Sequence, residues 1–249
     1  MHHHHNLKNE IDPTIVVDSR NNINYNTQNL SSSNHSNSNL NSNSNSNFNQ
    51  PKKIANPTPL GLASFSGTTF VLSLFNAHIR DVHVENLIVS LAFGYGGLVQ
   101  LLAGMWEFAC GNTFGATAFS AYGGFWISFG LILYPNSGIA AAYANSQEEL
   151  HIALGFFLFS WFIFTTIMLI AALRSSVALI ALFFFLDVTF LLLGIGQFYH
   201  ETQTIVKAGG VFGLITSFIG WYITAASLFE AGNHPIRLPV FDLSSNNRV

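Results

Sequence analysis

Six long apolar stretches occupy most of the chain between residues 58 and 229. They run at about 58–77, 85–108, 116–134, 150–173, 176–199 and 206–229. Each is close to the roughly 20 residues that an α-helix needs to cross a bilayer. Only 8% of the residues are charged, whereas a soluble domain carries about a quarter. The sequence therefore predicts an all-α, polytopic membrane protein, with six transmembrane helices in residues 54–232.

The two ends of the chain differ from this apolar part. Residues 1–53 are rich in Asn, Ser and His, and such a segment buries too little apolar surface to offset the entropy of ordering it. We predict a disordered tail there and a second, short tail at 233–249. Four basic residues fall on the predicted side of both termini and two on the other side: Lys52, Lys53, Arg174 and Arg237 against Arg80 and Lys207. Because cytoplasmic loops carry the excess of Lys and Arg, both termini are predicted to be cytoplasmic.

Several classes of function find no support in the sequence. The net charge is −3 and no basic stripe is present, which argues against a nucleic-acid partner. Cys110 is the single cysteine, so an internal disulfide framework and a thiolate metal site are excluded. Neither a phosphate loop nor an HExxH motif occurs. We predict no enzymatic activity, no metal site and no cofactor.

Polar side chains within the apolar stretches are the candidate functional groups, because they are costly in lipid. Asp187 is the clearest, and we interpret it as a proton-coupling or substrate-orienting group; the alternative is a structural carboxyl group bonded to a neighbouring helix. Glu107, near the end of its stretch, is expected to anchor the helix at the membrane interface. Thr68, Thr69 and Gln100 are uncharged groups that either line a path or cross-link helices.

Short motifs along the chain resemble those of the acetate uptake transporter family, which includes bacterial succinate–acetate permeases and fungal acetate transporters. They are NPTPLGL at 56–62, YGG at 95–97 with Gln100, GNTFGATAF at 111–119, YGGFW at 122–126, LLGIG at 192–196 and Leu238-Pro239. Their order and spacing agree from about residue 54 to 240, and the Asn-rich tail lies outside. In NPTPLGL, proline is tolerated in the first turn of a helix, and Asn56 is expected at the N-cap position.

The resemblance implies a protomer of six helices, a ring-shaped homo-hexamer and a substrate path inside each protomer. It also implies a hydrophobic constriction made by a Phe, a Tyr and a Leu. The matching positions are Phe65, Tyr122 and Leu186, the last found by counting back from the LLGIG motif.

The implied function is proton-coupled transport of acetate and related short carboxylates, with succinate a further candidate, across the plasma membrane. Acetate is mostly anionic near pH 7, and an anion at bilayer depth is costly unless it is coordinated or neutralised. Helix starts offer N–H donors and the positive end of a dipole, and the Tyr122 hydroxyl can donate to a carboxylate. The binding candidates are therefore Asn56, Thr68, Thr69, Gln100, Asn112 and Thr113.

Two other functions fit the same features. A six-helix ring with an apolar constriction would also serve as a passive channel for small neutral solutes such as ammonia or urea. A membrane sensor of nutrient state, signalling through the long tail, is the third possibility.

Overall fold

The computed structural model describes residues 54–82, 86–199, 203–232 and 234–243. They belong to one unit, which extends from Lys52 to Val249. The predicted tail at 1–53 lies outside the described residues.

Within the described residues, six helices are long and apolar enough to cross a membrane, which confirms the prediction from the apolar stretches. They are α1 (Thr58–Asn76), the continuous run Leu87–Ala109, α4 (Thr113–Leu133), α6 (Gln147–Ala172), α7 (Val177–Phe198) and α8 (Gln203–Ala231). The second run consists of α2 (Leu87–Phe93), the π-helical turn η3 (Gly94–Val99) and α3 (Gln100–Ala109). The short elements are η2 (Ile79–Asp81), η4 (Pro135–Ser137) and α5 (Ile139–Ala142).

Polar caps set where several helices begin. α4 starts at Thr113, three residues before the predicted stretch, because the Asn112 side chain accepts a hydrogen bond from Gly115 N–H at 3.1 Å. A capped first turn needs no apolar residues, so the apolar run marks the helix start too late. At α1 the N-cap residue is Pro57 rather than Asn56. The Asn56 side chain still accepts from the N–H of Thr58 at 3.0 Å, so it caps the helix from one residue further out.

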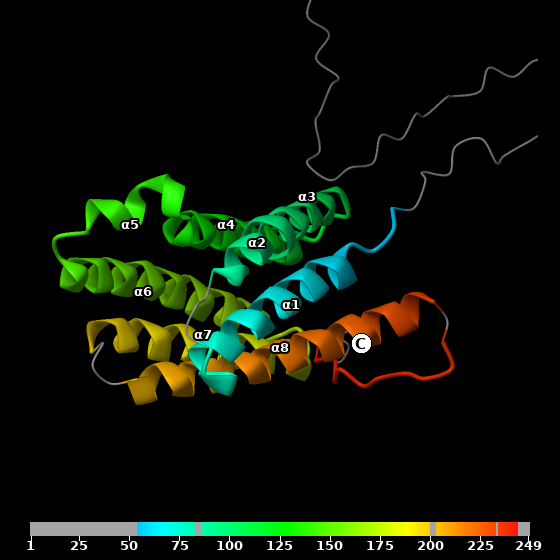
Figure 1. The fold of residues 1–249 in the computed structure, drawn as a ribbon. Coiled ribbons are helices and arrows are strands. Elements are labelled where there is room, and N and C mark those ends of the chain that lie inside the picture. The colour runs from blue at the N-terminus through cyan, green and yellow to red at the C-terminus, as the bar shows by residue number, and fades with distance from the viewer. Residues whose placement is uncertain (1–53, 83–85, 200–202, 233, 244–249) are drawn as a thin grey trace, which may run out of the picture. The chain divides into compact units, whose positions relative to one another are not determined.

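The helices pack as a closed bundle. α1 packs against α8, α8 against α7 and α7 against α6, while α3 packs against α4 and α1 (Figure 1). A hydrogen bond of 2.9 Å between Tyr122 on α4 and Thr165 on α6 connects these two helices and so completes the ring of helix contacts. We call the end at which α1, α4 and α7 begin the proximal end and the opposite end the distal end.

Small residues permit the closest helix contacts. A Cβ atom added to Gly210 of α8 would lie 2.5 Å from the backbone nitrogen of Ala77, just after α1. A Cβ on Gly220 would lie 2.1 Å from the Ser66 hydroxyl of α1. Such approaches are typical of membrane helices, where no hydrophobic effect drives association.

The π-helical turn in the second membrane helix was not predicted from the sequence. A π-turn contains one residue more per hydrogen-bonded turn than an α-helix, which rotates the residues that follow. A Cβ on Gly97 would lie 2.2 Å from the carbonyl oxygen of Ala92, so this turn requires glycine there. Gln100 comes directly after the turn and is fully buried.

The described part of the C-terminal segment, residues 234–243, crosses the start of α7. Val177 N–H donates to the carbonyl of Phe241 at 3.0 Å, and Ala178 N–H donates to that of Val240 at 3.3 Å. The segment therefore satisfies two first-turn donors of α7, which a helix cannot satisfy internally.

Candidate functional site

Two cavities lie inside the bundle and meet at three side chains. The distal cavity has a volume of about 180 Å³, and the proximal cavity about 140 Å³. Phe65, Tyr122 and Leu186 line both. These side chains are 5%, 3% and 3% exposed. The structure thus brings together, from α1, α4 and α7, the three residues that the sequence resemblance assigned to a constriction.

The Tyr122 ring is held by other aromatic rings. Its centroid lies 5.8 Å from that of Phe65, 5.5 Å from Phe164 and 6.5 Å from Phe190, to which it is parallel within 8°. Offset and edge-on pairs of this kind stabilise a ring position by about 0.5–1.5 kcal/mol each. Tyr122 is therefore a fixed wall between the cavities.

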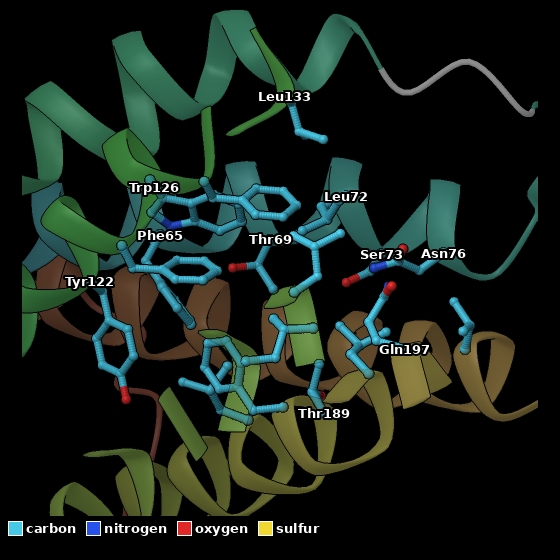
Figure 2. Close-up of a pocket in the computed structure, with 18 residues that line it drawn as sticks. Phe65, Thr69, Leu72, Ser73, Asn76, Tyr122, Trp126, Leu133, Thr189 and Gln197 are labelled. Carbon is cyan, nitrogen blue, oxygen red and sulfur yellow. The ribbon is translucent and has the colours of Figure 1, made fainter. Parts of the chain in front are cut away.

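The Tyr122 hydroxyl donates to Thr165 rather than into the cavity. Thr165 uses its single hydroxyl proton to bond the carbonyl of Trp161 at 2.7 Å, so Tyr122 is the donor in the 2.9 Å contact. Figure 2 shows the Tyr122 hydroxyl pointing away from the other labelled cavity residues. The expected donation to a bound carboxylate would require this bond to break.

The proximal cavity is surrounded by three helix starts and a buried amide. Thr58, Asn112 and Ser176, at the starts of α1, α4 and α7, contribute to its lining. Gln100 also lines it; this side chain is 0% exposed, and neither its Nε2 nor its Oε1 has a hydrogen-bond partner among the described residues. An unpaired buried amide costs about 1–3 kcal/mol, so Gln100 is the polar group of this cavity best placed to bind a ligand.

Most first-turn N–H groups around this cavity already have partners, contrary to the expectation that helix starts supply free donors. Asn56 and Asn112 cap α1 and α4 as described above, and Ser176 accepts from Leu179 N–H at 3.3 Å. The helix dipoles still point their positive ends at the cavity. Asn56 and Thr113 are exposed and belong to neither lining.

The distal cavity extends from the constriction to the distal end. Figure 2 shows Phe65 and Tyr122 at one end of it and Asn76 and Gln197 at the other. The Thr69 hydroxyl lines it and has no partner in the described part of the chain. Thr68, by contrast, bonds the carbonyl of Ser64 at 2.9 Å and lines neither cavity.

The structure places Asp187 outside the lining of both cavities. It is half-buried, and the Thr166 hydroxyl lies 3.0 and 3.3 Å from its two carboxylate oxygens. Asp187 thus has the geometry of the alternative interpretation, a carboxyl group bonded to a neighbouring helix.

The interpretation of Glu107 as an interface anchor was wrong. Its side chain is 1% exposed. It accepts from the Thr58 hydroxyl at 2.5 Å and from the Asn112 amide at 2.7 Å. Glu107 precedes Asn112 by five residues, and this short separation was the only sign in the sequence of the bond between them.

Comparison with known proteins agrees with the motifs. The GPR1/FUN34/yaaH family profile matches residues 38–245, so the match begins within the Asn-rich tail, earlier than the motifs indicated. Acetate permease A of Emericella nidulans is 51% identical over 198 residues, which cover 76% of this chain and 66% of that protein. Ammonia transport outward protein 2 of Saccharomyces cerevisiae is 48% identical over 197 residues, covering 79% of this chain and 70% of that protein. The chain thus spans about two thirds of the length of these curated relatives.

A solved structure, that of the bacterial acetate channel SatP, has the same fold. It aligns with a TM-score of 0.67 at 35% sequence identity, covering 76% of this chain and 99% of that chain. The six apolar helices, the ordered motifs and these similarities show that the chain is a multi-pass integral membrane protein and belongs to the GPR1/FUN34/yaaH family.

Proposed function

We propose that this chain transports acetate and related short monocarboxylates across the membrane, each with a proton, through the two cavities. The observation that carries the proposal is the meeting of two uncharged cavities at Phe65, Tyr122 and Leu186. The relatives named acetate permease and acetate channel support acetate as the substrate.

The lining of both cavities indicates which form of the substrate passes. Among the described residues that line them, none is Lys, Arg, His, Asp or Glu. Inside these two cavities an acetate anion would therefore meet no cation, and a buried unpaired charge is strongly unfavourable. The neutral acid avoids this cost. It carries its own proton and thereby couples transport to the proton gradient.

The polar and apolar groups match the two halves of acetic acid. The Gln100 amide can donate to the carbonyl oxygen of the acid and accept from its hydroxyl. Phe65 and Leu186 are suited to the methyl group, and as apolar side chains they exclude water between passages. This arrangement supports a transport role.

We further propose the cellular setting. The excess of Lys and Arg on the side of the termini favours a cytoplasmic proximal end. Plasma membrane is the proposed location, and a ring of six protomers is the proposed assembly, each with its own path.

Ammonia is the second candidate substrate. A relative named for outward ammonia transport is 48% identical. An uncharged, narrow path would also pass a small neutral base. The two substrates differ in chemistry, so they can be separated in one preparation.

The test is the initial rate of uptake into vesicles that contain the purified protein, with labelled acetate and labelled methylammonium measured in parallel at pH 6. Protein-free vesicles are the essential control, because acetic acid crosses lipid unaided. We expect saturable acetate uptake above this control. Saturable methylammonium uptake without any protein-dependent acetate uptake would overturn the assignment and favour the ammonia candidate.

A further inference from the structure

Glu107 lies directly behind the wall of the proximal cavity. Its two hydrogen-bond donors, the Thr58 hydroxyl and the Asn112 amide, both line that cavity. A Cβ on Gly115, another lining residue, would lie 3.1 Å from the Glu107 carboxyl carbon. The carboxyl group is therefore separated from the cavity by a single layer of side chains.

The bonds to Glu107 determine what the wall offers to a ligand. Thr58 has one hydroxyl proton and gives it to Glu107, so its oxygen presents only lone pairs to other partners. Asn112 gives one amide proton to Glu107, while its oxygen accepts from Gly115 N–H. Thr58 can thus accept from the O–H of a neutral acid and cannot donate to a carboxylate.

No cation balances Glu107 from the helices packed against it. α3 packs against α4, η3 and α1. In the described part of these elements, α1 has no ionisable side chain, α4 has only Tyr122 and η3 only Tyr95. The Cys110 thiol follows α3 but is exposed. A carboxylate entering the proximal cavity would therefore find no cation in this part of the wall, and an unpaired charge is unfavourable where water is excluded.

We propose that Glu107 is a positioning residue that determines the charge selectivity of the proximal cavity. It holds the Thr58 hydroxyl as a hydrogen-bond acceptor, so that short carboxylic acids enter in the neutral form and their anions find no donor at Thr58. This inference rests on the proposed function, which names short carboxylic acids as the substrate. It adds Glu107 as the residue that keeps the anion of the substrate out of the cavity.

The variant that tests it is Glu107→Gln, which has the same length and no charge. A glutamine can accept from Asn112 and donate to Thr58, which frees the Thr58 proton to donate into the cavity. For wild type, KM for total acetate should rise about tenfold per pH unit, because the neutral fraction falls tenfold. For Glu107→Gln we expect KM at pH 7 to fall at least tenfold below wild type, with KM at pH 5 within twofold.

A second readout separates charge selectivity from a structural role. At pH 7, uptake by Glu107→Gln should increase when the vesicle interior is made electrically positive, because the anion now crosses. Wild type and Glu149→Gln, the same change at an exposed position in the first turn of α6, should not respond. Wild-type pH dependence together with no response to potential in Glu107→Gln would overturn the inference. Absence of acetate uptake in wild type would instead overturn the proposed function.

Thr58 provides an independent test if Glu107→Gln does not fold. Thr58→Val removes the acceptor for the acid and should raise KM at pH 5 at least threefold. Thr58→Ser keeps the hydroxyl and should stay within twofold of wild type. Equal KM values for Thr58→Val and wild type would contradict the proposed orientation of Thr58.

Discussion

Replacing Gln100 by Leu is expected to raise the KM for acetate at least tenfold while making the empty protein more stable. The amide of Gln100 is buried in the proximal cavity without a partner in the described residues. Its desolvation costs about 1–3 kcal/mol until a ligand pairs with it. Leucine has a similar volume and no polar atoms, so it removes that cost. A tenfold loss of affinity corresponds to about 1.4 kcal/mol of lost binding energy.

Gln100→Leu is thus expected to weaken acetate binding and to raise stability, and a variant that only damaged the fold would lower both. We expect the midpoint of thermal unfolding in detergent, Tm, to shift upward by about 2–12 °C, from the size-scaled relation between stability and Tm. Gln147→Leu is the control, since Gln147 is exposed at the start of α6 and lines neither cavity. A lower Tm together with lower uptake would show that Gln100 supports the fold instead of binding substrate.

Replacing Leu186 by Ala is expected to broaden the substrate range, with uptake of butyrate relative to acetate rising at least tenfold. Leu186 is one of three side chains that separate the two cavities. Truncating it joins them at the constriction, where the longer acyl chain would otherwise be excluded. The expected cost in stability is about 2–5 kcal/mol, as for other buried leucines.

Leu182→Ala is the matched control for this change. Leu182 lies one turn earlier on α7 and is equally buried, but it lines only the proximal cavity. Both variants should lose similar stability in thermal unfolding, whereas only Leu186→Ala should change the butyrate to acetate ratio. An equal ratio in the two variants would mean that Leu186 does not limit the path.

The six membrane helices could be predicted because their signal is local. The length of each apolar stretch matches the bilayer, and no distant contact is needed to detect it. The starts of α4 and α6 could not be placed this way. They depend on the capping side chains Asn112 and Ser146, which lie outside the apolar runs.

Only part of the candidate site could be predicted from the sequence. Phe65, Tyr122 and Leu186 are apolar or amphipathic residues in apolar helices, and only the family resemblance singled them out. The direction of each polar group depends on three-dimensional packing. Gln100, directly after the π-turn, lines the proximal cavity, and Glu107 is bonded to two residues of its wall, whereas Asp187 faces Thr166 instead.

The proposal that acetate crosses as the neutral acid is tested most directly by measuring wild-type acetate uptake at constant pH under an imposed membrane potential. A potential of 100 mV is worth about 2.3 kcal/mol for each charge moved, so entry of the anion would change the initial rate many-fold. Passage as the neutral acid predicts the same protein-dependent rate at inside-positive, inside-negative and zero potential. A rate that rises steeply with an inside-positive potential would contradict proton-coupled passage through the two uncharged cavities.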